Sequence, residues 1–172
     1  MSEDDVLKEV QKYKVKHVLV TGGEPLLQRN TLSLLDRLNQ EGYRVSVETH
    51  GEISIEEASK RARIIMDIKT PGSGMNRGGY VDNFKFLKPT DEVKFVITST
   101  DDYSWASKIV KSGKIPSEEI LFSPAMTALN SPGKYEGIEP RTLADLIVKD
   151  QLPVRFQWQL HKLLWGADTK GV

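Results

Sequence analysis

The sequence has no cysteine, no excess of charge of either sign and no long apolar run. Without cysteine, the chain cannot form disulfide bonds, thiolate metal sites or an iron–sulfur cluster held by its own side chains. Its 24 basic and 24 acidic residues cancel, so overall charge gives no reason to expect binding to nucleic acid or to an anionic membrane. No apolar segment approaches the roughly 18 residues that a membrane span needs. Residues 1–5 are acidic, unlike a signal peptide, and we expect a cytoplasmic protein.

The residues that are present are typical of a globular domain. Apolar residues make up 38% of the chain and charged residues 28%. A length of 172 residues is enough to bury a continuous core. We therefore expect residues 1–172 to form a single domain.

Apolar periodicity predicts alternating helices and strands. Strand patterns occur at residues 17–21, 44–48, 63–68, 93–98, 120–122 and 154–159. Helical patterns occur at residues 2–13, with Ser2 as N-cap, at 29–40 and 54–60, at 100–110, with Thr100-Asp101-Asp102 as cap, and at 140–149. This alternation indicates an α/β fold with a mostly parallel sheet, either layered with helices or curved into a partial (β/α) barrel.

Polar loops follow four of the predicted strands. They are Thr21-Gly22-Gly23-Glu24-Pro25, Glu48-Thr49-His50-Gly51, the stretch from Asp67 to Gly74, and Ser123-Pro124-Ala125. Ligands of α/β proteins bind at the carboxyl ends of the strands, so these loops are candidates for one binding rim. Together they offer acceptors for an ammonium group, donors for a carboxylate and hydroxyls for a ribose. This is the set of polar groups that S-adenosylmethionine (SAM) requires.

Four segments resemble a known family. Gly-Gly-Glu-Pro at residues 22–25 resembles the element of that sequence in radical SAM enzymes. Val-Glu-Thr-His-Gly at residues 47–51 and Asp-Ile-Lys-Thr-Pro-Gly-Ser-Gly at residues 67–74 resemble the 7-carboxy-7-deazaguanine synthase family. Gln-Leu-His-Lys-Leu-Leu-Trp-Gly at residues 159–166 narrows the resemblance to this family. The resemblance covers essentially the whole chain.

The resemblance implies a fold, a reaction and cofactors. The fold is the partial (β/α) barrel of radical SAM enzymes. Members of the family are carbon–nitrogen lyases that contract 6-carboxy-5,6,7,8-tetrahydropterin to 7-carboxy-7-deazaguanine with loss of ammonia, in queuosine and archaeosine biosynthesis. A reduced [4Fe-4S] cluster cleaves SAM to a 5′-deoxyadenosyl radical, and magnesium assists.

The same resemblance assigns roles to individual residues. Glu24 is expected to face the ammonium group of SAM. The residues expected to bind SAM are Gly22, Gly23, Glu24, Glu48, Asp67, Ile68, Lys69, Phe122, Ser123, Pro124 and Ala125. Those expected to bind the pterin are Thr21, His161 and Val172, and no residue is assigned to catalysis or to a metal.

The chain also departs from the family pattern. The motif Cys-x-x-x-Cys-x-x-Cys that holds the cluster is absent, together with the strand before it. His50 stands where Asn or Gln is commoner, and Asp67-Ile68-Lys69 replaces the Ser-Pro-Lys of many members. We therefore expect the chain to be inactive as it stands. We also expect the edge of the strand at residues 17–21, left without its usual neighbour, to pair with a second copy as a homodimer.

Other interpretations are left open by the sequence. The chain could be a non-catalytic SAM- or pterin-binding module, a half-enzyme that depends on a partner, or another radical SAM enzyme of the activating type. Lys69 could contact SAM or pair with Asp67, and His161 could be structural. Trp158 and Trp165 could stack on a pterin or pack in the core, whereas Trp105 lies in a helical pattern and is expected to pack.

Overall fold

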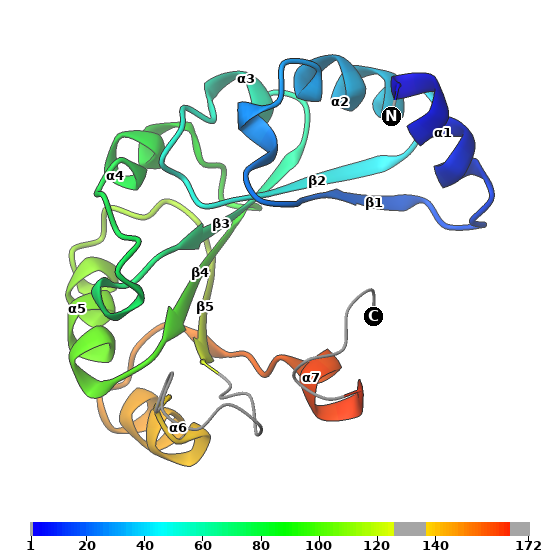
Figure 1. Ribbon diagram of the computed structural model, residues 1–172. Helices are drawn as coiled ribbons and strands as arrows, with labels where there is room; N and C mark the ends of the chain where they lie inside the picture. Colours follow the sequence, from blue (N-terminus) through cyan, green and yellow to red (C-terminus); the bar gives the residue numbers. More distant parts are fainter. Residues whose placement is uncertain (1, 126–136, 166–172) are drawn as a thin grey trace.

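Six parallel strands form one curved sheet in the computed structural model, which describes residues 2–125 and 137–165. The order along the sheet is the order along the chain: β1 (His17–Val20), β2 (Arg44–Thr49), β3 (Arg63–Ile68), β4 (Glu92–Ile97), β5 (Glu119–Pro124) and β6 (Arg155–Phe156). The strands follow an open arc with β1 and β6 at its edges (Figure 1). The predicted α/β fold with a mostly parallel sheet is confirmed. That residues 1–172 form a single domain stays a prediction.

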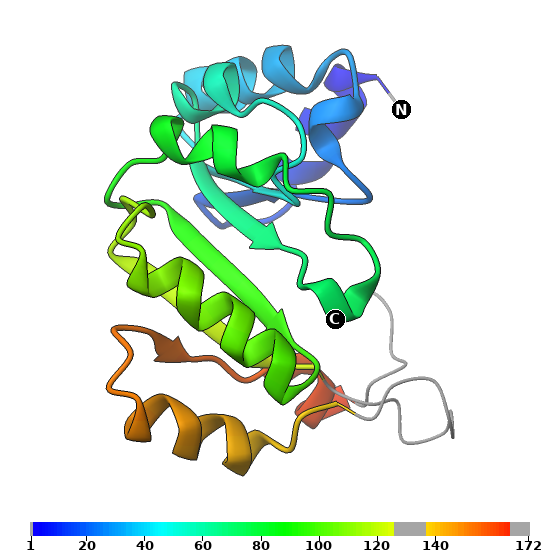
Figure 2. The same cartoon turned by 90° about the vertical axis from the view of Figure 1, so that its left-hand side faces the viewer.

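The helices lie almost entirely outside this arc. They are α1 (Glu3–Gln11), α2 (Thr31–Gln40), α3 (Glu56–Ser59), α4 (Tyr80–Asn83), α5 (Thr100–Lys111), α6 (Pro140–Lys149) and α7 (Leu160–Trp165), with short 3-10 turns η1 (Pro25–Leu27), η2 (Pro71–Ser73) and η3 (Phe84–Phe86). Only α7 lies on the inner side of the arc (Figure 1). Figure 2, turned by 90°, shows α5 lying along β4 on the outer side. Within the described residues, no helix is long and apolar enough to span a membrane.

The two faces of the sheet differ in polarity because successive side chains of a strand point to opposite sides. Fully buried Val47, Met66, Phe95 and Phe122 belong to the apolar core between the strands and the outer helices. Each has a polar neighbour on the inner, concave face: Glu48, Asp67, Lys94 and Ser123, beside apolar Ile65, Val96 and Leu121 on the same face. Parallel sheets are commonly apolar on both faces. The charged and polar side chains near the carboxyl ends of the strands therefore point to a binding surface rather than to a second core.

Local signals account for several helix ends. Ser2 caps α1 as predicted: its hydroxyl accepts the N–H of Asp5 at 3.2 Å, and the Asp5 carboxylate accepts the N–H of Ser2 at 3.1 Å. The helix predicted from residue 100 is capped by Ser99, whose hydroxyl accepts the N–H of Asp102 at 3.2 Å. The interpretation of Thr100-Asp101-Asp102 as the cap was wrong by one residue. Asp102 instead turns toward the strand ends.

The predicted strand at residues 154–159 is wrong beyond Phe156. Pairing with β5 continues for one further hydrogen bond, from the N–H of Gln157 to the carbonyl of Phe122 at 2.9 Å, and α7 then begins at Leu160. The sequence patterns did not predict α4, α7 or the three 3-10 turns. α4 and the turns have only three or four residues each, too few to give a periodic apolar pattern, and α7 has six.

Asn83 fixes the loop after β2 to the outer layer. Its side chain donates to the carbonyls of Gly51 and Ile53, both at 2.8 Å, and accepts the N–H of Ile55 at 3.0 Å. The residue is only 3% exposed, so these main-chain groups have little access to water. One buried amide therefore satisfies three main-chain groups of a segment that has no strand partner.

We expect Asn83→Ala to lower the free energy of unfolding by about 2 kcal/mol or more, because it leaves buried polar groups unsatisfied. Asn39→Ala is the matched control, since Asn39 donates a single bond to the carbonyl of Arg61 at an exposed site. Its expected effect is within about 1 kcal/mol. Urea unfolding of the two variants measures the difference, and equal losses would contradict this role for Asn83.

Candidate functional site

The loops singled out in the sequence lie along one edge of the sheet. Val20 is in register with Val47, and Thr49 with Met66. Further along, Ile68 is in register with Phe95, and Ile97 with Pro124. The strands are parallel, so the loops that follow them are neighbours in the order of the chain. The prediction that these loops share one rim is confirmed.

Glu24 ties the first loop of the rim to the second. Its side chain is 3% exposed, and its carboxylate accepts the N–H of Leu26 at 3.0 Å, which caps η1. The hydroxyl of Thr49 lies 2.9 Å from both carboxylate oxygens. The N–H of His50 donates to Oε2 at 3.0 Å, and Nε2 of the same residue lies 3.1 Å from that oxygen. Gly22, with φ of +146°, provides the chain reversal that brings Glu24 there.

The ring of His50 has a defined tautomer when it is neutral. Its Nδ1 accepts the N–H of Glu52 at 3.0 Å, so Nδ1 carries no proton. The proton is then on Nε2, which lies 3.1 Å from Oε2 of Glu24. The ring is 28% exposed, in contrast to the nearly closed carboxylate.

Two further carboxylates repeat this arrangement around the rim. Glu52, after the second loop, accepts the N–H of Arg77 at 3.2 Å and of Gly79 at 2.7 Å in the loop after β3. These bonds hold the second loop to the third. The sequence analysis did not single out Glu52, although its position directly after the Gly51 turn was a signal.

Asp102 joins the third loop to the fourth strand. It is 2% exposed and accepts the N–H of Gly72 at 2.8 Å and the hydroxyl of Thr70 at 2.9 Å. It also accepts the hydroxyl and the N–H of Thr98. A Cβ on Gly72 would lie 2.6 Å from Oδ2 of Asp102, so this position requires glycine. In the sequence, Asp102 was interpreted only as part of a helix cap.

A chain of charges crosses the concave face below the rim. Lys94 of β4 donates to Glu48 at 2.7 Å and lies 3.9 Å from Asp67. Lys69 donates to Asp67 at 2.7 Å, so the pairing alternative for Lys69 is observed. Burial lowers the pKa of Lys94, but the Asp67 and Glu48 carboxylates outweigh it and leave the pKa above its usual value. Thr21 donates to Glu48 at 3.3 Å. Lys94 was not identified from the sequence, where it is one charge within an alternating strand.

Polar atoms without partners gather on the same face. Among the described residues, Asp67 Oδ1, Ser123 Oγ and Gln159 Oε1 are buried and accept or donate no hydrogen bond. Native proteins leave few such atoms unpaired, so these three atoms mark places where a partner is missing among the described residues. Beside them lies a cavity of about 440 Å³, lined by Glu48, Lys94, Gln157, Trp158, Gln159 and Leu160.

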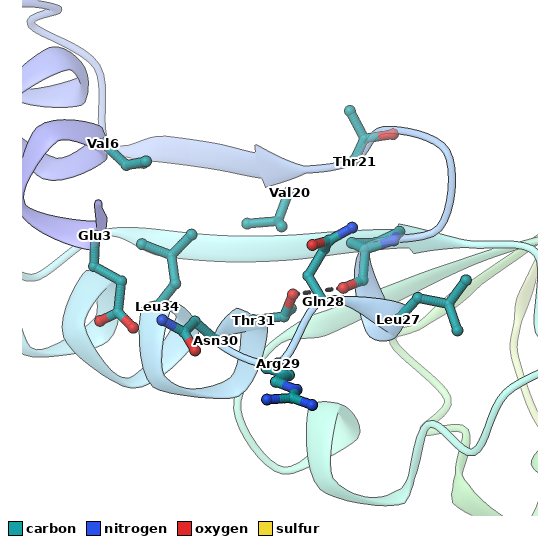
Figure 3. Close-up of a pocket in the computed structure, with 11 residues that line it drawn as sticks. Glu3, Val6, Val20, Thr21, Leu27, Gln28, Arg29, Asn30, Thr31 and Leu34 are labelled. Carbon is teal, nitrogen blue, oxygen red and sulfur yellow. Dashed lines mark hydrogen bonds between the residues drawn. The ribbon is translucent and has the colours of Figure 1, made fainter. Parts of the chain in front are cut away.

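A second cavity, of about 670 Å³, lies near the β1 edge, between α1, β1 and the start of α2 (Figure 3). Its apolar lining includes Val6, Val20 and Leu34, and a hydrogen bond from the Thr31 hydroxyl to the Pro25 carbonyl runs beside it (Figure 3). Of the residues predicted to bind ligand, Thr21 is among those that line this cavity. Thr21 also donates to Glu48, so the cavity adjoins the charged concave face at this residue.

Not every predicted site residue presents its side chain to this face. Ile68 and Phe122 are fully buried in the core, which leaves only their main-chain atoms near the rim. The side chain of His161 and the whole of Val172 lie outside the described residues. The residues on or beside the rim and the concave face are Thr21, Gly22, Gly23, Glu24, Glu48, Asp67, Lys69, Ser123, Pro124 and Ala125.

The tryptophans divide between packing and the cavity. Trp105 packs as predicted, with ring centroids 6.1 Å from those of both Phe95 and Tyr80. Trp158 lines the 440 Å³ cavity and lies 6.0 Å from Phe156. Trp165 is 54% exposed on α7, so packing in the core does not describe it.

Known proteins resemble this chain over most of its length. Residues 1–121 match the model of the radical SAM superfamily. The 7-carboxy-7-deazaguanine synthase of Koribacter versatilis (strain Ellin345) is 36% identical over 180 residues, which span all of this chain and 79% of that protein. That of Chlorobaculum tepidum is 37% identical over 176 residues, spanning all of this chain and 76% of the relative.

A solved structure supports the fold. QueE from Escherichia coli superposes with a TM-score of 0.62 at 20% identity, covering 91% of this chain and 64% of that one. The superfamily match and the full-length relatives confirm the resemblance seen in the sequence. The chain belongs to the 7-carboxy-7-deazaguanine synthase family of the radical SAM superfamily.

Proposed function

We propose that the rim and the concave face bind SAM and 6-carboxytetrahydropterin, the ligands of 7-carboxy-7-deazaguanine synthases. The observation that carries this proposal is the group of buried, unpartnered polar atoms beside the rim, Asp67 Oδ1 and Ser123 Oγ. Unpaired buried acceptors and donors favour a polar ligand over an apolar one. These residues fit SAM, whose amino acid and ribose groups carry both donors and acceptors.

In this proposal, each strand-end loop contacts a different part of SAM. Glu24 accepts the ammonium group, and Gly22 and Gly23 let the main chain approach it, since an added Cβ on either would meet no atom within 4 Å. Lys69, with its side chain 37% exposed, faces the carboxylate. Asp67 and Ser123 bind through side chains, and Ile68, Phe122, Pro124 and Ala125 through the main chain.

The pterin is proposed to occupy the cavity of about 440 Å³, a volume within the range of small-molecule sites. Thr21 and Glu48 lie at its rim side, and Trp158 offers an aromatic surface. His161 and Val172 belong to the same proposal from the resemblance alone. An activating-type radical SAM enzyme has a different substrate. Binding of carboxytetrahydropterin to this chain therefore distinguishes the proposed function from that alternative.

The residues present do not fit a self-held iron–sulfur cluster. Such clusters are bound by thiolates, and the sequence contains no cysteine. Within the described part of the chain, no three His, Asp or Glu side chains gather as a metal site either. We therefore propose that this chain, by itself, is a ligand-binding part of such an enzyme and performs no radical chemistry. A cytoplasmic location is part of the same proposal.

The β1 edge supports a further part of the proposal, self-association. Among the described strands, β1 pairs only with β2, so its outer edge presents free main-chain groups. Leu19 in the middle of this strand is 49% exposed. An edge with these features favours pairing with the same edge of a second copy.

We expect SAM to bind the wild-type chain, and Asp67→Ala to weaken this binding about tenfold, because a charged acceptor is lost. Glu41→Ala is the control, since Glu41 is an exposed carboxylate at the end of α2, away from the rim. Isothermal titration calorimetry of the three proteins measures the change. Loss of affinity in both variants alike, or no binding to the wild type, would contradict the proposed site.

Incubation of the purified chain with iron, sulfide and a reductant is expected to give no iron–sulfur absorbance, because no thiolate is available. Addition of SAM is then expected to give no 5′-deoxyadenosine. Product analysis by liquid chromatography measures this, with an active radical SAM enzyme as positive control. Formation of 5′-deoxyadenosine by this chain would refute its proposed inactivity.

Sedimentation equilibrium is expected to show a dimer that Leu19→Lys converts to a monomer, because a charge at a strand edge opposes edge pairing. Val148→Lys is the control at a 76% exposed apolar position on α6. A wild-type monomer at high concentration would contradict dimerisation through the β1 edge. A dimer that persists in Leu19→Lys would contradict it too.

A further inference from the structure

The Glu24 carboxylate is crowded by groups of its own protein. It accepts hydrogen bonds from the N–H groups of Leu26 and His50 and from the hydroxyl of Thr49. The ring Nε2 of His50 lies 3.1 Å from Oε2, and the Glu24 side chain is only 3% exposed. The two oxygens of a carboxylate offer about four lone-pair positions, so three are used by these donors. The His50 ring lies next to the remaining one, where the ammonium group of a ligand would have to bind.

One of these four groups around Glu24 can leave more easily than the others. The N–H groups of Leu26 and His50 belong to the main chain, and the first of them caps η1. Thr49 is 2% exposed at the end of β2, and its hydroxyl also accepts the N–H of Gly51 at 3.2 Å. The His50 ring is 28% exposed and needs only side-chain rotation to move. The ring is therefore the group that an incoming cation displaces.

We propose that His50 competes with the ligand's ammonium group for Glu24 and so restricts the rim to ligands that carry a cation at this position. The inference rests on the proposed function, in which Glu24 accepts the ammonium of SAM. An ammonium group brings a full positive charge to the carboxylate, whereas the neutral ring brings only a dipole. A ligand without the cation makes no interaction with Glu24 that could offset the free-energy cost of displacing the ring.

Movement of the ring also reaches the next loop. Nδ1 of His50 accepts the N–H of Glu52, and the Glu52 carboxylate holds the N–H groups of Arg77 and Gly79. Displacement of His50 from Glu24 removes the acceptor of the Glu52 N–H. Occupation of the ammonium position is thereby coupled to the loop after β3.

Calorimetric titration with two ligands tests the competition. SAM carries the ammonium group, and 5′-methylthioadenosine shares its adenosine and sulfur but lacks the amino acid part. In His50→Ala, the affinity for SAM is expected to rise about tenfold, the equivalent of about 1.4 kcal/mol. The affinity for 5′-methylthioadenosine is expected to stay unchanged. His17→Ala is the control, since His17 lies on β1 beside Arg44 and does not touch Glu24.

Nitrogen NMR of the histidine rings gives a second readout on the unmodified chain. The sequence contains three histidines, and His50→Asn assigns the signals of the ring in question. SAM is expected to shift the Nε2 and Nδ1 signals of His50, whereas 5′-methylthioadenosine is expected to leave them in place. This readout does not depend on the stability of a variant.

The outcomes separate the inference from the proposed function. SAM binding that is unchanged or weakened in His50→Ala, or equal tightening of both ligands, overturns the competition and leaves SAM binding itself intact. Unmoved His50 signals in the SAM complex also overturn it. Absence of SAM binding in every protein overturns the proposed function, and the competition with it.

Discussion

The buried carboxylate of Glu24 holds the end of β1 to the end of β2, and the rest of the rim extends from that contact. Glu24 takes donors from Thr49 and His50 of the second loop. Glu52 then takes donors from the third loop, and Asp102 joins that loop to β4. Each carboxylate satisfies main-chain groups that have no strand partner, which is the requirement for any buried loop. The rim is thus a series of neighbouring loops, each fixed by a carboxylate from an adjacent segment.

Strand alternation decides what lies below this rim. Because each strand places one side chain in the core and the next on the concave face, Phe95 packs while Lys94 reaches Glu48. The same alternation leaves Asp67 and Ser123 on the concave face, with buried atoms that no group among the described residues satisfies. The outer face of the sheet thus contributes to the core, and the concave face carries the charged and unpaired polar groups. In the proposed function, these groups and Glu24 select for polar, cationic ligands.

The sequence predicted the sheet and the rim better than it predicted the contacts within the rim. Strand positions followed from apolar alternation, and the loops at Gly22 and Gly51 followed from glycine directly after a strand. The contacts of Glu52 and Asn83, and those of Asp102 with the loop after β3, each join residues at least 25 positions apart, so local pattern did not indicate these partners. Ile68 and Phe122 illustrate the same limit, since a motif match does not reveal which side of a strand a residue faces. The short α4 and the two-residue β6 fall below the length at which periodicity is informative.

We propose that this rim binds SAM although the chain has no cysteines to hold an iron–sulfur cluster. A crystal structure of the chain soaked with SAM tests it most directly. The account predicts electron density for the ligand across the ends of β1, β2, β3 and β5, with its ammonium group within hydrogen-bond distance of Glu24 and the His50 ring turned away. Density confined to the cavity beside β1, or a ligand whose ammonium group points away from Glu24, would contradict it.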